Sequence, residues 1–441
     1  MNKSLRINKL INPFNKTISV EGDKSLSIRW VLLSSLSKKK SVAFNLLKSE
    51  DVFSALNCIK KLGAKVKISK DKCNIIGIGL NYKQNHKQKQ NLILNAGNSG
   101  TVGRLILGLL INYNNKIKLV GDKSLSKRDF SRVTRPLKKF GASFSVKKTL
   151  PLTMRGTNKP KSINYIENKG SAQCKTSIML AALKSEGVTR IKAKKSRDHT
   201  EILFKYLKIP LKIKKNKKYD IIQIKGVKNI NPLYYKIPGD ISSCSFFIVL
   251  TILSKNSKLL IKNVNVNPSR IGIINILKKM GASIKILNKK NYKGEKTADI
   301  FIKSSKNLKA INCPSKYNSS AIDEFLIIFL VAAKSKGISI FKNLAELNQK
   351  ESPRLIWGSK ILNYMGIRTK LTRNSIKIYG NPNLVIKNNI QIKNFLKDHR
   401  VFMMSVIAAL TFKTKGSWDI YDLESIKTSF PTFLKTLKKL M

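Results

Sequence analysis

Apolar residues recur at the spacing of a helix in several segments of the chain, and each of these segments ends in a similar phrase. One example places Val52, Leu56, Ile59 and Leu62 on a single helical face. The closing phrases are Lys60-Lys-Leu-Gly-Ala64, Lys138-Lys-Phe-Gly-Ala142, Lys278-Lys-Met-Gly-Ala282 and Asn363-Tyr-Met-Gly366. Basic side chains suit the negative end of a helix dipole, and glycine adopts the left-handed conformation that ends many helices. We therefore predict that each of these glycines ends a helix.

Apolar and polar residues alternate directly after these phrases, as in Ala64-Lys-Val-Lys-Ile68 and Ala282-Ser-Ile-Lys-Ile-Leu287. This period of two predicts half-buried strands. Tyr206-Leu-Lys-Ile-Pro210 resembles a further copy without the glycine. The helix–strand modules recur at roughly 70 to 85 residues, so about six would fit the chain, three in each of two domains. We predict an α/β (α+β) protein. A doubly wound nucleotide fold is not expected, because the sequence has no G-x-G-x-x-G motif after an early strand.

A second set of phrases, rich in glycine and small polar residues, precedes apolar helical runs. The set is Gly22-Asp-Lys-Ser-Leu-Ser, Gly97-Asn-Ser-Gly-Thr-Val-Gly-Arg104, Gly121-Asp-Lys-Ser-Leu-Ser, Gly170-Ser-Ala-Gln-Cys-Lys-Thr-Ser177 and Gly239-Asp-Ile-Ser-Ser-Cys-Ser245. Ser or Asp caps a helix start, and the free N–H groups there attract anions. One such phrase is usually only a cap. Five of them, several with Lys or Arg, favour a cavity that handles phosphate groups.

The charge of the chain is strongly positive, with 87 basic and 23 acidic residues and a net charge of +64. Clustered basic residues would indicate nucleic-acid binding. Here the excess is spread along the whole chain, and aromatic residues rarely interleave with it. We therefore favour a coding bias toward Lys, Asn and Ile and expect no nucleic-acid partner. A positive field would still steer small anionic substrates toward the protein.

The cysteines and histidines give no sign of a disulfide framework or a metal site. The five cysteines lie far apart without a CxxC pair, and there are only three histidines. The longest apolar runs, residues 246–253 and 325–333, are much shorter than the roughly 20 residues that a membrane span needs. The first residues lack the apolar core of a signal peptide. We expect a reduced cytoplasmic protein without a membrane partner.

Acidic residues are scarce, so those in ordered phrases are candidates for chemistry. Asp323 is predicted in the first turn of an apolar helix, where it could complement the dipole or accept a proton. Glu351, in Lys350-Glu-Ser-Pro-Arg354, could be a surface ion-pair member or a proton donor beside an anion clamp. Arg400 follows Asp398-His and precedes another apolar helix, and arginine suits a carboxylate or phosphate in two-point contacts.

Ten short motifs, in this order, resemble those of the EPSP synthase (3-phosphoshikimate 1-carboxyvinyltransferase) family of enolpyruvyl transferases. They are GDKSLSIR, NSGTVGR, SLSKR, SAQCKTS, SRDHTE, PGDISS, AIDE, KESPR, DHR and TSFP, between Gly22 and Phe433. Each motif alone is weak, whereas ten in the family's order are highly specific. The resemblance covers nearly the whole chain.

The resemblance implies a two-domain enolpyruvyl transferase fold. Each domain would hold three βαβαββ units, with helix starts facing an interdomain cleft that contains the active site. The first domain would combine residues 1–22 with 239–441, and the second would be residues 23–238. A monomer is expected.

The implied reaction transfers the enolpyruvyl group of phosphoenolpyruvate to the 5-hydroxyl of shikimate 3-phosphate and releases phosphate. This is the sixth step of the shikimate pathway to chorismate and aromatic amino acids. No metal and no organic cofactor is implied. The chemistry needs a base for the hydroxyl, an acid for the enol methylene, and cations around two phosphates and two carboxylates.

The resemblance also implies roles for individual residues. Shikimate 3-phosphate would contact Lys24, Ser25, Arg29, Ser171, Ala172, Gln173, Ser196, Asp323 and Lys350. Phosphoenolpyruvate would contact Lys24, Gly100, Arg128, Gln173, Arg354 and Arg400, with Asn98 and Thr101 shaping the turn at Gly100. Asp323 would accept the hydroxyl proton, and Glu351 would move the methylene proton with Lys24 as a partner. Glyphosate occupies the phosphoenolpyruvate site in this family, and Gly100 leaves room for it.

Three positions depart from the family's usual pattern. Pro353 stands where Asp is common, Asp129 where Pro is usual, and Lys427 lies one residue out of register with a lysine that many members carry. The nearest alternative is the sister enolpyruvyl transferase that acts on UDP-N-acetylglucosamine. That family typically has Lys-Asn where this chain has Lys24-Ser25, and a reactive Cys that has no counterpart between Cys73 and Cys174. A basic nucleic-acid-binding protein remains the alternative from another class.

Overall fold

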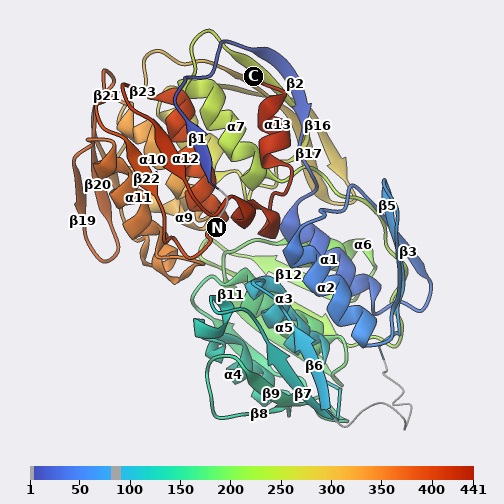
Figure 1. Cartoon of the computed structure of the whole chain (residues 1–441). Helices are drawn as coiled ribbons and strands as arrows, with labels where there is room; N and C mark the ends of the chain where they lie inside the picture. The colour runs from blue at the N-terminus through green and yellow to red at the C-terminus, as the bar shows by residue number, and fades with distance from the viewer. Residues whose placement is uncertain (1–3, 81–90) are drawn as a thin grey trace. The chain divides into compact units, whose positions relative to one another are not determined.

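The chain forms two compact units, which we describe separately. The computed structural model describes residues 4–80 and 91–441 (Figure 1). Unit 1 consists of residues 1–21, 238–292 and 296–441, and unit 2 consists of residues 22–237 and 293–295. The boundaries implied by the family resemblance lie one residue away at both junctions, and they do not place residues 293–295 with unit 2. Figure 1 shows the discontinuity of unit 1: the blue strand β1 (Leu5–Ile7) pairs with β24 (Trp418–Ile420) from the red end of the chain, and the blue strand β2 (Asn15–Ser19) joins the yellow sheet of β15 (Lys258–Asn265) to β17 (Glu295–Lys303).

Unit 2 contains the element order strand–helix–strand–helix–strand–strand twice. The first run is β6 (Asn91–Asn95), α3 (Gly100–Leu109), β7 (Lys116–Val120), α4 (Ser131–Lys139), β8 (Ser143–Phe144) and β9 (Leu152–Arg155). The second is β10 (Asn164–Glu167), α5 (Ala172–Ala182), β11 (Val188–Lys194), α6 (His199–Tyr206), β12 (Leu211–Lys215) and β13 (Tyr219–Lys225). The remaining elements are α1 (Lys24–Ser34), β3 (Lys40–Phe44), α2 (Glu50–Lys61), β4 (Lys65–Ile68), β5 (Lys72–Ile76) and β14 (Tyr234–Lys236).

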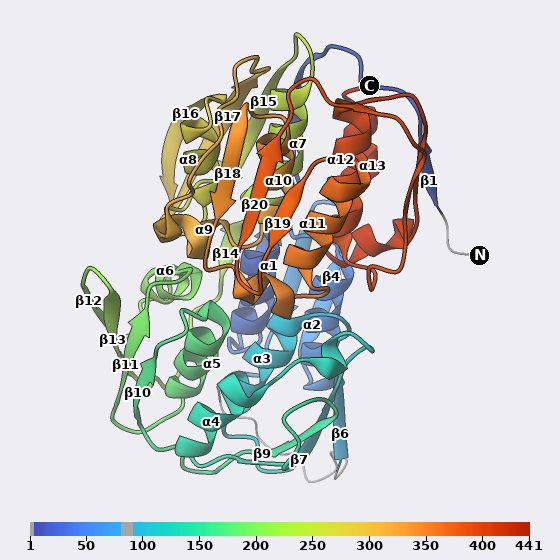
Figure 2. The ribbon, with the colours of Figure 1, turned by 90° about the vertical axis from the view of Figure 1, so that its left-hand side faces the viewer.

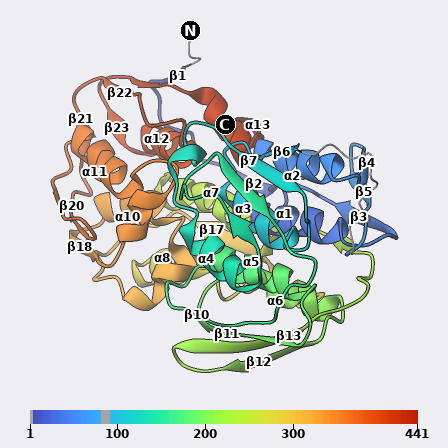
Figure 3. The same cartoon turned by 90° about the horizontal axis from the view of Figure 1, so that it is seen from below.

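The three sheets of unit 2 share one topology. Their strand orders are β14-β3-β5-β4, β6-β7-β9-β8 and β10-β11-β13-β12. In each sheet the first pair is parallel and the next two pairs are antiparallel. Figure 3 shows the strands of the last of these sheets side by side in green, with α5 and α6 on one side of the sheet. Along β11 the residues alternate strictly between buried and exposed, as expected for a sheet with one covered face.

Helices α3 and α5 approach closely inside unit 2, at Gly108. A Cβ atom at this position would lie 2.0 Å from the backbone oxygen of Ser177. Only glycine therefore allows the two backbones to meet there. Both helices begin at predicted site residues, so their packing fixes two helix starts relative to each other.

Unit 1 contains one four-stranded sheet and shorter ones. The four-stranded sheet has the order β16-β17-β15-β2, with β15 (Lys258–Asn265), β16 (Ser283–Tyr292) and β17 (Glu295–Lys303). The other sheets combine β18 (Gly337–Phe341), β20 (Ile376–Gly380) and β19 (Thr369–Leu371); β1, β24 (Trp418–Ile420) and β22 (Ile390–Ile392); and β21 (Val385–Ile386) with β23 (Lys413–Thr414). Figure 2 shows the sheet of β18, β20 and β19 in orange. Mixed parallel and antiparallel sheets with helices confirm the predicted α/β class.

Three fully buried helices form the core of unit 1. They are α7 (Ile241–Leu253), α10 (Phe325–Ala333) and α12 (His399–Thr411), which pack against one another. The other helices are α8 (Gly272–Lys279), α9 (Asn318–Ala321), α11 (Arg354–Tyr364) and α13 (Phe433–Lys438). Helices that are apolar on all sides are typical of such central positions. The starts of α10, α11 and α12 carry the predicted site residues of this unit.

The predicted helix ends are confirmed. Gly63, Gly141, Gly281 and Gly366 all have positive φ angles, between 88° and 108°. Each lies two residues after the last residue of a helix, as in a left-handed C-terminal cap. In the copy without glycine, Lys208 takes the same place with φ 57°, two residues after the end of α6 and before β12. The module therefore keeps its backbone shape even where the sequence lacks its usual residue.

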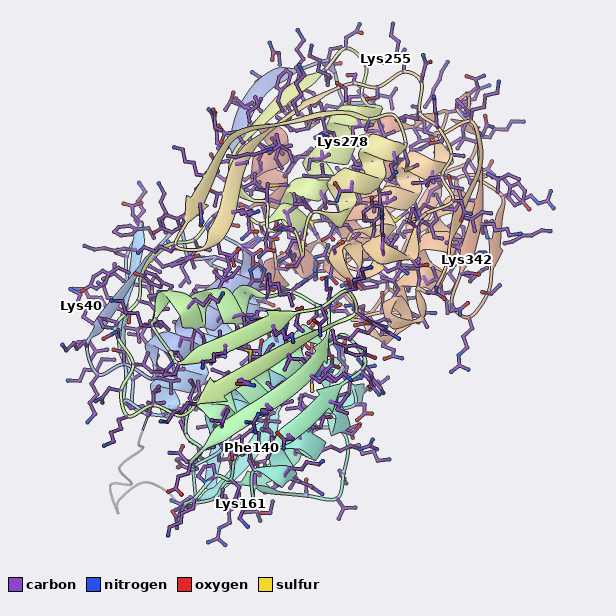
Figure 4. All side chains as sticks on the ribbon, turned by 180° about the vertical axis from the view of Figure 1, so that it is seen from behind. Lys40, Phe140, Lys161, Lys255, Lys278 and Lys342 are labelled. Carbon is purple, nitrogen blue, oxygen red and sulfur yellow. The ribbon has the colours of Figure 1, made fainter. Side chains whose placement is uncertain are left out.

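Lysine side chains project from all parts of the surface. The labelled Lys40, Lys161, Lys255, Lys278 and Lys342 in Figure 4 come from both units, and all are exposed. This even distribution agrees with the spread of basic residues along the sequence. Within residues 4–80 and 91–441, no helix has the length and apolar character needed to cross a lipid bilayer.

Candidate functional site

The octapeptide Gly22-Asp-Lys-Ser-Leu-Ser-Ile-Arg29 recurs with one change as Gly121-Asp-Lys-Ser-Leu-Ser-Lys-Arg128, and helix α1 of unit 2 begins inside the first copy. The Asp23 carboxylate accepts a hydrogen bond from the Leu26 backbone N–H at 2.9 Å, which caps the helix. Lys24 follows, and its Nζ lies 3.0 Å from Oδ2 of the buried Asp51 in α2. The ammonium group of Lys24 is therefore oriented by a carboxylate of the neighbouring helix, with about a fifth of the side chain exposed (20%).

Arg29, one turn further along α1, is held by hydroxyl groups of two other helices. Its Nε donates to Thr200 Oγ1 at 2.8 Å and its Nη2 to Thr176 Oγ1 at 3.1 Å. The backbone oxygen of Ser25 accepts from Nη1 at 3.1 Å. Arg29 thus joins the starts of α1, α5 and α6. Arg29 and Ser25 lie one turn apart on α1.

A second group of predicted residues meets between α3 and α5. The Gln173 side chain accepts from Arg104 Nη1 at 2.7 Å and donates to Thr101 Oγ1 at 3.0 Å. A Cβ atom added to Gly100 would lie 2.9 Å from Arg104 Nη1 and 3.1 Å from Arg128 Nη1. Gly100, Arg128 and Gln173 are therefore neighbours, and Arg104 lies among them.

The predicted phosphate-binding residues at the start of α5 are partly exposed. Ser171 caps this helix by accepting from the Cys174 backbone N–H at 3.2 Å, and Ala172 begins it. Ser196 precedes α6, and its buried Oγ has no hydrogen-bond partner in the part of the chain that the structure describes. A buried hydroxyl without a partner is uncommon, and a bound ligand is one way to satisfy it.

The second copy of the octapeptide does not open an α-helix, so this expectation was wrong. Asp122 Oδ1 accepts from the Leu125 N–H at 2.7 Å, as Asp23 does from Leu26. Only one 3₁₀ turn follows, η1 (Leu125–Lys127), and α4 begins later. The first copy continues into an apolar run, whereas the second continues into Lys127-Arg-Asp129, which offers no buried face. Arg128 is left extended at the end of the turn.

In unit 1, two cations converge on the carboxylate of Asp323. Its Oδ1 lies 3.3 Å from Lys350 Nζ and 3.5 Å from Arg354 Nη1. The predicted place of Asp323 in the first turn of the long helix was wrong, because α10 begins at Phe325. Asp323 lies in the turn between α9 and α10, where its carboxylate is 15% exposed. Turn geometry, not a helix dipole, presents this group.

Arg354 is surrounded by three carboxylates. It donates to Asp398 from Nε at 2.9 Å and from Nη2 at 3.2 Å, and Nη2 also contacts Glu351. Burial alone would lower the pKa of Arg354, but the attraction of Asp398, Glu351 and Asp323 raises it above its usual value. Burial alone would likewise raise the pKa of Asp398, and Arg354 lowers it below the ordinary range. Both groups are therefore charged in the folded protein.

Arg400, at the start of α12, points to the turn that carries Asp323. Its Nη1 donates to the Asp323 backbone oxygen at 2.7 Å and lies 3.8 Å from Glu324 Oε1. Its backbone N–H donates to Asp398 at 2.9 Å. All five residues predicted for this unit therefore lie in one cluster: Asp323, Lys350, Glu351, Arg354 and Arg400.

Two residues in these clusters were missed by the sequence reasoning. Asp398 was noted only as part of a phrase, although it contacts Arg354 and caps α12. Arg104 closes the glycine-rich phrase at α3 and contacts Gln173, but in the sequence alone it cannot be told apart from the rest of a capping motif. Asp398 and Arg104 share one feature that could have pointed to them: each is a charged residue inside a phrase that begins a helix. The structure distinguishes such residues because it shows their partners.

The three departures have local explanations. Pro353 precedes α11, with φ −71°, and Arg354 is braced by Asp398 from another helix. Asp129 accepts from the Ser131 N–H at 2.6 Å and the Ser131 hydroxyl at 2.8 Å, which starts α4. Burial opposes its charge, but these bonds and nearby Lys148 and Arg132 lower the pKa of Asp129. Lys427 is 55% exposed and pairs with Glu424.

No group of three or more potential metal ligands occurs among residues 4–80 and 91–441. The two clusters instead offer cations, amides, hydroxyls and carboxylates. The EPSP synthase (3-phosphoshikimate 1-carboxyvinyltransferase) family matches residues 9–437. The chain belongs to the EPSP synthase family.

Individual members of the EPSP synthase family are similar to this chain along almost their entire length. The 3-phosphoshikimate 1-carboxyvinyltransferase of Petrotoga mobilis is 37% identical over 432 residues, which is 97% of each chain. The protein of the same name from Bacillus cereus (strain G9842) is 35% identical and covers 99% of each chain. A solved structure of EPSP synthase from Acinetobacter baumannii superimposes with a TM-score of 0.84 at 31% identity, covering 99% of this chain and 98% of that one.

Proposed function

We propose that this member of the EPSP synthase family transfers the enolpyruvyl group of phosphoenolpyruvate to the 5-hydroxyl of shikimate 3-phosphate. The products are 5-enolpyruvylshikimate 3-phosphate and phosphate. One observation carries the assignment beyond family membership: a carboxylate, Asp323, lies between the cations of Lys350 and Arg354. A base flanked by cations suits a reaction between two anions in which a hydroxyl must lose its proton.

Asp323 is the proposed base in the addition step. The 5-hydroxyl of shikimate 3-phosphate gives its proton to the Asp323 carboxylate while the oxygen forms a bond to C2 of phosphoenolpyruvate. Carbon C3 receives a proton in the same addition, so charge does not accumulate on the former double bond. Breaking the C2–O bond to phosphate and losing a proton from C3 then regenerates the double bond. The C3 proton returns to the group that supplied it, and the hydroxyl proton held by Asp323 passes to the departing phosphate, which is the only leaving group.

Glu351 is the proposed group that gives the proton to C3 and takes it back. Its carboxylate contacts Arg354 and is partly exposed, with 18% of the side chain accessible. Lys24 of unit 2 is its proposed partner in this transfer. The contact between Lys24 and Asp51 leaves the ammonium partly exposed and oriented. A lysine and a carboxylate together can hold and release one proton.

Cations and helix starts would bind the anionic groups of the substrates. We assign phosphoenolpyruvate to Lys24, Gly100, Arg128, Gln173, Arg354 and Arg400, where arginine can contact a carboxylate at two points. We assign shikimate 3-phosphate to Lys24, Ser25, Arg29, Ser171, Ala172, Gln173, Ser196, Asp323 and Lys350. The N–H groups at the start of α5 support a phosphate there, as does the Ser196 hydroxyl, which has no hydrogen-bond partner within residues 4–80 and 91–441.

The proposed function is tested by phosphate release with purified protein. Phosphate should appear with phosphoenolpyruvate and shikimate 3-phosphate together, and with neither substrate alone. Replacing shikimate 3-phosphate by UDP-N-acetylglucosamine should give no release. Turnover with the sugar nucleotide would instead indicate the sister transferase.

The high positive charge calls for a separate test of nucleic-acid binding. Duplex DNA affinity should be weak at physiological salt, because the basic residues are spread along the chain and are not gathered in one segment. Tight binding that survives this salt, together with no transferase turnover, would overturn the proposal. We also propose that the protein acts as a cytoplasmic monomer, which sedimentation and cell fractionation can test.

A further inference from the structure

Glu324, the residue after Asp323, is fully buried at the entrance to α10, with 0% of its side chain exposed. It accepts a hydrogen bond from the Ser242 hydroxyl of α7. Its Oε1 also lies 3.8 Å from Nη1 of Arg400. A buried carboxylate is costly unless it is paired and hydrogen-bonded, so this position is strongly constrained.

A second buried arginine, Arg270, supports Glu324 indirectly through the Ser242 hydroxyl. Arg270, which precedes α8 and is 2% exposed, donates from Nη2 to Ser242 Oγ at 2.8 Å. The same nitrogen lies 3.1 Å from Asp240 Oδ1. The Ser242 hydroxyl therefore accepts from Arg270 and donates to Glu324. Positive and negative groups alternate along this path, from Asp240 through Arg270 and Glu324 to Arg400.

This path of hydrogen bonds and ion pairs ends at Arg400 and Asp323, two residues that the proposed reaction needs. Arg400 Nη1 contacts Glu324 and the backbone oxygen of Asp323, so one nitrogen is fixed by two neighbouring residues. Arg400 makes no other side-chain hydrogen bond within residues 4–80 and 91–441, which leaves the rest of its guanidinium for an anion. Without the Glu324 charge, only a neutral carbonyl would orient this nitrogen.

We propose that Glu324 is a positioning residue for phosphoenolpyruvate: it orients Arg400, and Ser242 with Arg270 holds Glu324 in place. This inference rests on the proposed function. Glu324 itself touches no substrate, because its carboxylate is enclosed by Ser242 and Arg400. Its effect should therefore fall on the substrate that Arg400 binds and much less on shikimate 3-phosphate.

Steady-state kinetics of Glu324→Gln test this inference. Gln keeps the size of the side chain but removes the charge, so KM for phosphoenolpyruvate should rise roughly tenfold, as for loss of a charge-assisted contact. KM for shikimate 3-phosphate should change less than about twofold, since the cations assigned to it remain. Glu324→Asp, which keeps the charge on a shorter side chain, should restore part of the affinity.

Asp299→Asn is the matched control. Asp299 is a buried carboxylate of the same unit, but its partners are Lys262, Asn263 and Asn288, outside the cluster. This variant should leave both KM values unchanged, even if it lowers stability. Equal effects of both variants on both KM values would mean that Glu324 is only structural.

A double-mutant cycle shows whether Glu324 acts through Arg400. In an Arg400→Lys background, Glu324→Gln should add little to the KM for phosphoenolpyruvate, because the group that it orients is already altered. Fully additive effects would overturn the inference. If Glu324→Gln does not fold, Ser242→Ala removes one support of the carboxylate and should raise the same KM by about two- to threefold. A wild-type protein without phosphate release would refute the proposed function itself, whereas an active wild type with an unchanged variant refutes only the role of Glu324.

Discussion

The carboxylate of Asp398 fixes two arginines at once. It accepts two side-chain hydrogen bonds from Arg354, at 2.9 and 3.2 Å, and one from the backbone N–H of Arg400 at 2.9 Å. Ser352 also donates to it through its N–H and its hydroxyl. One buried residue therefore joins the starts of α11 and α12 and sets the spacing of the two proposed phosphoenolpyruvate arginines.

Asp398→Asn should lower stability and change its dependence on pH. Removing one partner of a buried ion pair typically costs about 3–5 kcal/mol. The folded-state pKa of Asp398 lies below its ordinary value, despite burial, mainly because of Arg354. Its stabilising contribution is therefore complete above the unfolded pKa of about 3.9 and is lost as the pH falls through the folded value.

Urea unfolding from pH 7 down to pH 3 measures this effect. The difference in unfolding free energy between wild type and Asp398→Asn should be largest near neutral pH and shrink below about pH 4. Parallel curves over the whole range would show that Asp398 makes no ionic contribution.

Asp323→Asn should reduce turnover while leaving substrate binding largely intact. Loss of a general base typically lowers kcat by about 10²- to 10⁴-fold. Lys350 and Arg354 remain to bind the anions, so the KM values should change little. Glu346→Gln is a suitable control because Glu346 lies 3.8 Å from the same Lys350 but is 47% exposed. A near-normal kcat for Asp323→Asn would exclude Asp323 as the base.

Gly100→Ala should weaken binding at the proposed phosphoenolpyruvate site. The new Cβ would lie 2.9 Å from Arg104 Nη1 and 3.1 Å from Arg128 Nη1, so both guanidinium groups must shift. We expect wild type to be inhibited by glyphosate and the variant to need a higher concentration, with a higher KM for phosphoenolpyruvate. Gly103→Ala is the control in the same helix, because its Cβ would contact the Phe130 ring instead. Equal inhibition of wild type and Gly100→Ala would contradict the assignment.

Gly108→Ala should destabilise unit 2 without involving a substrate. Its Cβ would overlap the Ser177 backbone oxygen at 2.0 Å, and a backbone atom cannot move aside as a flexible side chain can. Overpacking of this kind typically costs about 1–3 kcal/mol or more. Thermal unfolding measures the loss, and an unchanged melting temperature would mean that α3 and α5 separate easily.

The cysteine thiols should not react in the folded protein. All five are buried, and burial raises the pKa of Cys58 and Cys174 to about 12 and of Cys73 and Cys313 to about 11. Thiolate is the reactive form, so at pH 8 little of it is present and it is enclosed. Ellman's reagent should detect the thiols only after unfolding. Rapid reaction of one thiol in the native state would locate a region that opens easily.

The helix–strand modules could be predicted because their signals are local. A helix end of this kind depends on one residue, usually glycine, with a left-handed backbone conformation. The structure has a residue with positive φ at each predicted helix end. The octapeptide shows the limit of such signals. Asp23 and Asp122 make the same capping bond, yet only Asp23 begins an α-helix, since the helix depends on apolar residues that follow and can be buried.

The partners of the site residues could not be predicted from the sequence. Asp323 and Arg400 are separated by 77 positions but joined by a hydrogen bond, and Arg29 and Thr200 by 171. Such pairs depend on packing between distant helices, for which a single sequence carries no signal. The motif order identified the residues, and the fold supplied Asp398, Arg104 and Glu324 as their supports.

The interruption of unit 1 has a consequence for synthesis on the ribosome. Strand β2 pairs with β15, and the neighbouring bond from Phe14 to Ser257 spans 243 positions. Translation therefore produces nearly all of unit 2 before β2 meets its partner strand. We expect unit 2 to fold first during elongation, while the first strands of unit 1 wait unpaired until the later part of the chain emerges.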